Sequence, residues 1–258
     1  MGGIPPNQCR EEGLHRPWTG PRPKICIPKT DPNLGLNQNA LGVRSWDKYA
    51  SLIQGKGEMG KVYPTYKWGV EGDTPSFLHI MPNGLNDPED PLQVGWGGYH
   101  VFGLSPDGET SAWTNWEKPA KDLSDSYGKG FYPDVFNDFA ARMEWAEKGE
   151  GNTNPVVIVN GKGGYSPVKV SAKAGKTLTL DASRSFGPGG DGLSFRWWVQ
   201  REAGSYGPAV EITSSTSPKV RVRIPEDDKG KTLHIICEVH DSGPFNLVSY
   251  KRLIVSVE

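Results

Sequence analysis

The sequence is poor in cysteine, has no long hydrophobic run and carries almost no net charge. Its three cysteines, Cys9, Cys26 and Cys237, follow neither a metal-binding spacing nor a disulfide framework. No segment approaches the roughly 18 consecutive apolar residues that a transmembrane helix needs. The formal net charge of -1 lacks the positive excess typical of proteins that bind nucleic acid. We therefore expect no nucleic-acid partner and no membrane partner.

The first residues also lack the features of a secretory leader. The start, MGGIPPNQ, contains no apolar stretch, so we expect no signal peptide in this sequence. Residues 1–44 are rich in proline and poor in periodicity, which predicts an irregular Pro-rich N-terminal segment. Cys9 and Cys26 both fall in this segment, and the sequence does not show whether they pair.

The strongest helical signal is the run PDVFNDFAARMEWAEKG at residues 133–149. Val135, Phe136, Phe139 and Met143 recur there at helical spacing, and the Lys-Gly pair at 148–149 suits a C-terminal end. Residues 101–130 show little periodicity and predict loops. The charged, Gly-containing and Pro-ended stretch at 147–155 predicts a domain boundary.

After residue 155 the hydrophobic period changes from helical to two. Several short alternating runs separated by turn clusters predict an antiparallel sandwich of roughly seven strands. The alternation turns Trp197 and Cys237 toward the core, Cys237 as a buried free thiol, and turns Trp198 to the opposite side. The last strand changes phase midway, which predicts a bulge near Lys251.

Residues 69–100, GVEGDTPSFLHIMPNGLNDPEDPLQVGWGGYH, combine acidic residues, turn signals and one short apolar stretch. Such a segment is typical of a loop that contributes to a site from a rigid element. The run EGDTPSFL…NGLNDPEDP…GWGG resembles the C-terminal part of the nucleoside-hydrolase-like domain of Sde182-type cellulose-binding proteins. The later run AGKTLTLDASRSFGPGGDGLSFRWWV resembles the opening strands of polycystic-kidney-disease-type immunoglobulin-like domains, in the position where Sde182-type proteins carry their C-terminal domain.

Together the two resemblances imply an α/β fragment, the C-terminal part of a nucleoside-hydrolase-like fold, at residues 45–150. An all-β immunoglobulin-like sandwich is expected to follow at residues 155–258. The resemblance also implies secretion. Because a whole domain of the first type needs several βα units before this segment, we expect the chain to be either the C-terminal portion of a longer protein or a shortened gene product.

The resemblance implies N-glycosyl hydrolase chemistry around a Ca²⁺ ion. Asp73 stands for the family's metal-binding aspartate, and Gly72 stands where the family has a histidine that protonates the leaving base. Glu71 is the candidate catalytic acid in its place, since a carboxyl with a raised pKa can act as a general acid. From the residues alone, Asp73 fits the N-cap of a helix that begins at Thr74-Pro75 better than a metal ligand. With the resemblance the two interpretations stand level, and both can hold together.

The family's first-strand aspartate cluster has no counterpart here. Lys29-Thr30-Asp31-Pro32 matches only its beginning, and no paired aspartates follow. Because Ca²⁺ takes about 6–8 oxygen ligands, we do not expect this chain alone to bind it tightly. Whether the chain is an enzyme therefore stays open.

Our hypothesis is a nucleoside-hydrolase-like protein that acts on or binds glycosyl compounds, with a carbohydrate or nucleoside-like ligand. The alternative is a non-catalytic, cellulose-binding protein, and a third is an interaction protein that uses the sandwich edge. Trp96 and Trp198 are the candidate substrate-binding residues, because an exposed indole can stack on a sugar ring. A local loop core for Trp96 and an inter-domain contact for Trp198 are the alternatives. The sequence leaves the oligomeric state open.

Overall fold

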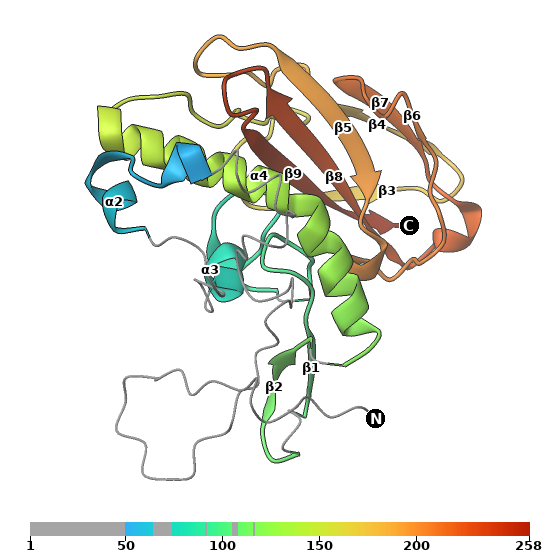
Figure 1. The fold of residues 1–258 in the computed structure, drawn as a ribbon. Coiled ribbons are helices and arrows are strands. Elements are labelled where there is room, and N and C mark those ends of the chain that lie inside the picture. Colours follow the sequence, from blue (N-terminus) through green and yellow to red (C-terminus); the bar gives the residue numbers. More distant parts are fainter. Residues whose placement is uncertain (1–49, 64–73, 91, 105–107, 116) are drawn as a thin grey trace.

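The structure is a computed structural model that describes residues 50–63, 74–90, 92–104, 108–115 and 117–258. Its helices are α2 (Gly57–Val62), α3 (Thr74–Ile80) and the long α4 (Ala120–Lys148). An antiparallel ribbon of β1 (Val101–Leu104) and β2 (Ser111–Thr114) precedes α4 and lies apart from the other strands (Figure 1). No helix among these residues is long and apolar enough to cross a membrane.

Two sheets make up the rest of the chain. The four-stranded sheet has the order β3 (Val168–Ala172), β9 (Val248–Val257), β8 (Thr232–Asp241), β5 (Leu193–Val199). The three-stranded sheet has the order β4 (Thr177–Asp181), β7 (Lys219–Arg223), β6 (Ile212–Thr213). The pair β3–β9 is parallel and the other pairs are antiparallel. Two short 3-10 helices, η3 (Arg201–Ala203) and η4 (Glu226–Asp228), connect strands.

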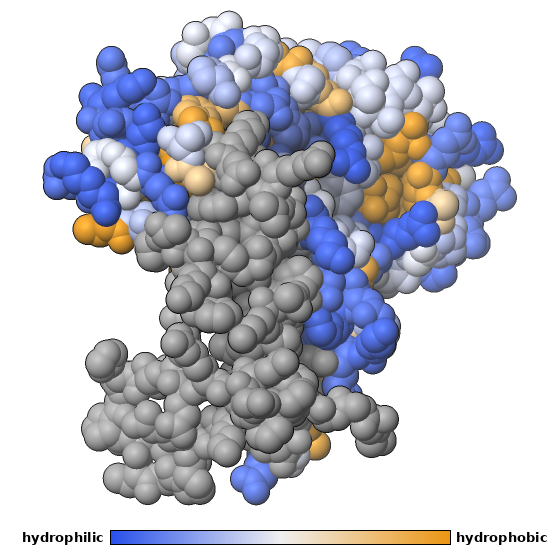
Figure 2. Space-filling model, viewed as in Figure 1, coloured by the Kyte–Doolittle hydropathy of each residue, from blue (hydrophilic) through white to orange (hydrophobic). Residues whose placement is uncertain are grey.

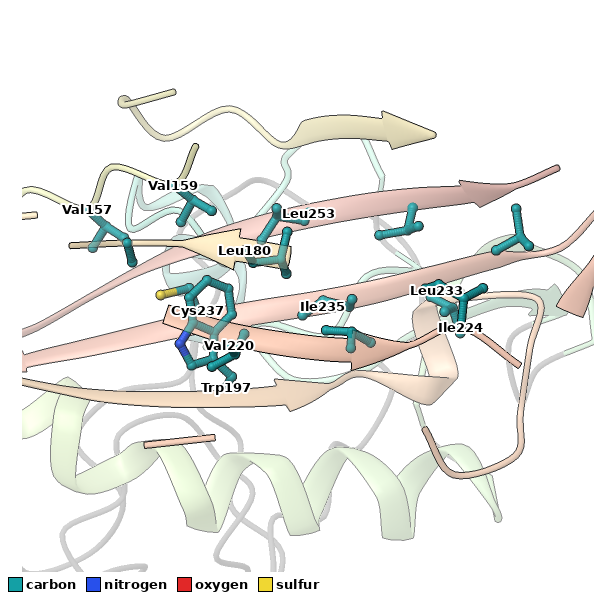
Figure 3. Packing of buried hydrophobic residues seen from close by; sticks show 14 of the residues in the cluster. Val157, Val159, Leu180, Trp197, Val220, Ile224, Leu233, Ile235, Cys237 and Leu253 are labelled. Carbon is teal, nitrogen blue, oxygen red and sulfur yellow. The ribbon is translucent and has the colours of Figure 1, made fainter. Parts of the chain in front are cut away.

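The two sheets share a hydrophobic core (Figure 3). Trp197 of β5 is 3 % exposed and donates its indole N–H to the Ser217 carbonyl at 2.9 Å. Cys237 of β8 is a buried free cysteine, and burial raises the pKa of its thiol. The inward positions predicted for both residues are therefore confirmed. The period-two alternation specified them because successive side chains of a strand point to opposite faces.

α4 begins earlier than the sequence indicated. The prediction of loops over residues 101–130 was wrong, because β1, β2 and the first part of α4 occupy much of that stretch. Gly128 and Gly130 are poor helix formers, and Pro133 has no N–H to donate, so local propensity argued against a continuous helix. Burial of Phe131 and its neighbours outweighs that propensity. The predicted C-terminal end is confirmed, since Gly149 is left-handed and its N–H bonds to the Trp145 carbonyl.

A second hydrophobic core lies between α4 and the other side of the four-stranded sheet, which we call the outer face (Figure 1). Ile236, Val248 and Tyr250 point into this core, whereas Leu253 and Val255 point into the core between the sheets. The predicted bulge near Lys251 is wrong, because β8 and β9 pair without interruption from Thr232↔Ser256 to His240↔Val248. The phase change arises because β9 contributes hydrophobic residues to both faces.

Candidate functional site

The outer face places charged and aromatic side chains in cross-strand rows. Arg196 of β5 pairs with Glu238 of β8, which pairs with Tyr250 of β9. The next row on the same face runs from Trp198 through Ile236 to Arg252. Paired residues of neighbouring strands lie close enough for their side chains to interact.

α4 lies over these rows. Tyr127, Phe131 and Asp134 follow one another at spacings of four and three residues, so they lie on one side of the helix. Between this side and the outer face is a pocket of about 330 Å³. Residues of α4, β5 and β8 line it: Ser126, Tyr127, Gly130, Phe131, Asp134, Arg196, Trp198 and Glu238.

One wall of the pocket is aromatic. The rings of Tyr127 and Phe131 stack with centroids 6.0 Å apart. Trp198 lies at 6.4 Å from Tyr127 and 6.5 Å from Phe131, tilted by 32° and 41°. The Trp198 indole is half-buried, and its N–H donates to Glu238 Oε2 at 2.9 Å. This bond fixes the ring orientation and leaves part of the ring at the pocket.

Glu238 is held ionised by its partners. Besides the Trp198 indole, His240 Nε2 lies 3.2 Å and Arg196 Nη1 3.4 Å from Glu238 Oε1. Burial alone would raise the pKa of Glu238, but the bonds from His240 and Trp198 and the Arg196 charge outweigh it and lower that pKa. Burial likewise opposes the charge on His240, and its bond to Glu238 raises the His240 pKa in net. Glu238 is thus a fixed carboxylate on one side of the pocket.

Asp134 is in the opposite condition. Burial raises its pKa to about 6, a rise offset in part by His240 and by the bond from Tyr250. The Tyr250 hydroxyl donates to Asp134 Oδ2 at 3.0 Å, and the Trp96 indole N–H donates to the Tyr250 hydroxyl at 3.2 Å. Among the described residues, no cation forms an ion pair with Asp134. The two carboxyl groups of the pocket therefore differ in their affinity for a proton.

The raised pKa of Asp134 should make stability depend on pH. In the folded protein this carboxyl keeps its proton to a higher pH than in the unfolded chain, so stability falls as pH rises through about 6. Asp134→Asn removes the charge, and its effect on the free energy of unfolding should become more favourable by about 1–3 kcal/mol between pH 4 and pH 7. Urea unfolding at both pH values measures this change.

The exposed Asp122 on the same helix is the matched control. Asp122→Asn should shift the free energy of unfolding by nearly the same amount at both pH values. An Asp134→Asn effect that is equally independent of pH would contradict the assignment of the raised pKa.

Arg252 lies at the end of the row that starts at Trp198, and its side chain is fully buried. Its Nε and Nη2 donate to the Leu85 carbonyl at 2.9 and 2.6 Å, and Nη2 also donates to the Val94 carbonyl at 3.0 Å. Nη1 donates to Gln200 Oε1 and lies 3.2 Å from His234 Nδ1. Burial lowers the pKa of Arg252 to about 10, and burial and the Arg252 charge lower that of His234 to about 4. At neutral pH the guanidinium is charged and the imidazole is a neutral acceptor.

These bonds attach the segment at residues 82–90 and 92–98, which we call the docking segment, to the sheet. The Tyr250 and Arg252 amides donate to the Asn83 and Gly84 carbonyls at 2.9 and 3.1 Å, so the docking segment extends the hydrogen bonding along β9. Gly84 has a φ of 85°, and a Cβ there would lie 2.0 Å from the Tyr250 carbonyl oxygen. Only glycine fits this approach.

The site residues predicted from the sequence have different outcomes in the structure. Glu71 and Asp73 lie outside the described residues, so their roles stay predictions. Trp96 is 4 % exposed and packs edge-on against Tyr250 at 6.3 Å, which is a core position. Trp198 both packs against the core under α4 and lines the pocket. Another tryptophan, Trp113, lies exposed on β2 beside Phe102.

Calcium also stays a prediction. No group of three or more His, Cys, Asp or Glu side chains able to hold a metal ion is found in the part of the chain that the structure describes. The one metal ligand expected from the sequence, Asp73, lies outside that part.

Sequence reasoning missed Asp134, Arg196, Glu238, Tyr250 and Arg252. Asp134 lies at the start of the run predicted as a helix, where a carboxylate is common and does not indicate a site. His234 is 5 % exposed, beneath the docking segment. One signal in the sequence could have indicated this site, namely the phase change of β9. Val248 and Tyr250 are large hydrophobic residues on the outer face, so another element must cover that face.

Two family models match the chain. "Cellulose-binding Sde182, nucleoside hydrolase-like domain" matches residues 27–100. "Cellulose-binding protein Sde0182, C-terminal domain" matches residues 177–257. The second range contains the pocket residues of β5 and β8, and α4 lies between the two ranges. Among curated proteins, none matches the chain significantly.

Solved structures include a similar protein from Saccharophagus degradans, a nucleoside hydrolase-related hypothetical protein described as associated with carbohydrate metabolism. It is 35 % identical with a TM-score of 0.74, over 82 % of this chain and 54 % of its own. This chain thus spans about half the length of that protein. The PKD domain of the KIAA 1837 protein (19 % identity, 42 % and 92 % covered) and the titin M3 domain (16 %, 40 % and 96 %) reach TM-scores of only 0.27 and 0.23.

Proposed function

We propose that this chain, which belongs to the family of Sde182-type cellulose-binding proteins with a nucleoside-hydrolase-like domain, binds polysaccharide in the pocket between α4 and β8. The observation that carries the proposal is the aromatic wall of Tyr127, Phe131 and Trp198 beside the polar groups of Asp134, Arg196 and Glu238.

The chemistry of a sugar ring fits these two kinds of wall. A pyranose ring has a face of C–H groups and a rim of hydroxyls. The face can pack on an indole or phenyl ring, which offers a large apolar area. The rim needs acceptors and donors, and the carboxylate of Glu238 and the guanidinium of Arg196 supply both in charge-assisted form. A concave site in which aromatic side chains lie beside a few fixed polar groups is typical of ligand binding.

Binding to insoluble cellulose tests the proposal. Trp198→Ala removes the ring that β5 presents to the pocket and should weaken binding by about 1–3 kcal/mol, the range for stacking of a flat ring on an aromatic side chain. A depletion isotherm, which measures the protein left in solution at increasing amounts of cellulose, gives the affinity.

Trp113→Ala is the matched control, because Trp113 is a tryptophan exposed on β2 and does not line the pocket. It should leave cellulose binding within about twofold of the unmodified protein. If Trp113→Ala abolishes binding and Trp198→Ala does not, the ribbon and not the pocket is the contact surface, and our assignment is wrong.

We also infer that residues 155–258 are an immunoglobulin-like sandwich and that residues 45–150 are the C-terminal part of a nucleoside-hydrolase-like domain. The hydrophobic core shared by the two sheets and the match of residues 177–257 support the first assignment. The match of residues 27–100 supports the second. We infer an extracellular location from the cellulose-binding family, since cellulose is an insoluble extracellular polymer.

A further inference from the structure

We propose that the pocket also hydrolyses the O-glycosidic bond of the carbohydrate it holds, with Asp134 as the general acid and Glu238 as the general base. This activity rests on the proposed binding function, because the same pocket must first hold the sugar. It is distinct from the Ca²⁺-dependent N-glycosidic chemistry implied by residues 71–73, and it uses none of those residues.

The geometry that points to hydrolysis is a pair of carboxyl groups on facing elements around one pocket. Asp134 extends from α4 and Glu238 from β8, and both line the same space. Helix and strand are rigid supports, and each carboxyl group is held by hydrogen bonds, from Tyr250 in one case and from Trp198 and His240 in the other. Two carboxyl groups that flank a sugar are the usual catalytic groups of glycoside hydrolysis.

The surroundings also give the two groups different protonation states. Asp134 faces Tyr250 of β9, Glu238 and His240 of β8 and Arg196 of β5. Neither of the two basic side chains, His240 and Arg196, forms an ion pair with Asp134. Glu238 has His240 and Arg196 as direct partners. Between about pH 4.5 and pH 6, Asp134 therefore carries a proton while Glu238 is ionised. Such a separation is what assigns acid and base in a carboxyl pair.

The reaction balances with water as the only co-reactant. Asp134 transfers its proton to the glycosidic oxygen while the bond from that oxygen to the anomeric carbon breaks, and the leaving sugar departs as an alcohol. Glu238 stabilises the positive charge on the anomeric centre and takes a proton from the water molecule whose oxygen bonds to that carbon. Proton exchange with solvent then returns Asp134 to its acid form and Glu238 to its carboxylate form.

Hydrolysis of soluble cello-oligosaccharides by the full chain tests the inference. At pH 5 and saturating oligosaccharide, we expect new reducing ends to appear, and the rate to fall as pH rises past about 6 with loss of the Asp134 proton. Asp134→Asn, which cannot supply the proton, should lower the saturated rate at least about 100-fold. Saturation matters because a loss of affinity alone would then leave the rate unaffected.

Asp122→Asn is the matched control, since it makes the same change on an exposed part of α4 and should keep the full rate. Tyr250→Phe provides a second readout. The Tyr250 bond lowers the pKa of Asp134, so its removal should move the fall in rate to higher pH, which a purely structural role would not do.

The outcomes separate the two proposals. If the unmodified protein binds cellulose through Trp198 but releases no reducing ends at any pH, the hydrolytic inference is wrong and the binding function stands. Full activity in Asp134→Asn would place the chemistry elsewhere and also overturn it. If the unmodified protein neither binds cellulose nor hydrolyses cello-oligosaccharides, both proposals are wrong.

Discussion

Replacement of Arg252 by methionine should lower the free energy of unfolding by about 3–5 kcal/mol, the cost of removing one partner from a buried charged network. The side chain is fully buried and donates to the carbonyls of Leu85 and Val94 and to the side chain of Gln200. Methionine fills a similar volume but donates no hydrogen bond. The substitution leaves the backbone carbonyls of Leu85 and Val94 in place, so these oxygens would stay buried without the hydrogen bonds from the guanidinium.

Urea unfolding at pH 7 measures this loss, and two variants control it. Arg221→Met makes the same change on an exposed position of β7 and should stay within about 0.5 kcal/mol of the unmodified protein. Arg252→Lys keeps the charge but lacks the planar guanidinium that reaches several acceptors at once. Its free energy of unfolding should therefore lie between those of Arg252→Met and Arg221→Met. A loss below about 1 kcal/mol for Arg252→Met would mean that the docking segment holds to the sheet without the guanidinium.

Trp197→Ala should destabilise the protein by about 3–5 kcal/mol, because a large aromatic side chain is removed from a closely packed core. The indole lies between the two sheets beside Val220 and Cys237 (Figure 3) and is 3 % exposed. Its loss also leaves the Ser217 carbonyl without the indole N–H. Thermal or urea unfolding followed by circular dichroism measures the change.

The adjacent Trp198 is the natural comparison for Trp197. Trp198→Ala removes the same side chain from the outer face, where the ring is half-buried beside a pocket, so it should cost about 1–2 kcal/mol. It should lower cellulose binding, and Trp197→Ala should not do so in the molecules that remain folded. If Trp198→Ala unfolds the protein as readily as Trp197→Ala, the Trp198 ring is mainly structural and the proposed sugar contact is wrong.

Much of the strand pattern after residue 155 could be predicted from the sequence. Trp197 and Cys237 sit in runs that alternate between apolar and polar residues, and such runs indicate which side of a strand is buried. The same logic failed for the outer face. His234, Glu238 and Arg252 occupy positions that usually face water, and charged residues there are typical of a solvated sheet face. They are buried because α4 and the docking segment, both distant in sequence, cover them.

The candidate site could not be predicted from the sequence, because its residues also depend on the position of α4. Asp134 follows a proline, and a Pro-Asp pair ahead of a helical run is a strong signal for a helix beginning. Because α4 starts at Ala120, Asp134 instead lies within the helix and faces the sheet. Trp198 was found by its phase relative to Trp197. Its partners Tyr127 and Phe131 both precede the run at residues 133–149 that was predicted as a helix, so no pattern pointed to them. Hydrophilic side chains also cover most of the described surface on the face shown in Figure 2, which does not single out a site.

The position of β9 has a consequence for the synthesis of the protein. This strand follows every other described element along the chain, yet it lies between β3 and β8, and its amides also bond to Asn83 and Gly84. A ribosome releases the earlier segments first, and domains commonly begin to fold as they emerge. Here both hydrophobic cores lack a central wall until β9 has emerged. We therefore expect a newly made chain to complete both cores in one late step, after β9 has emerged.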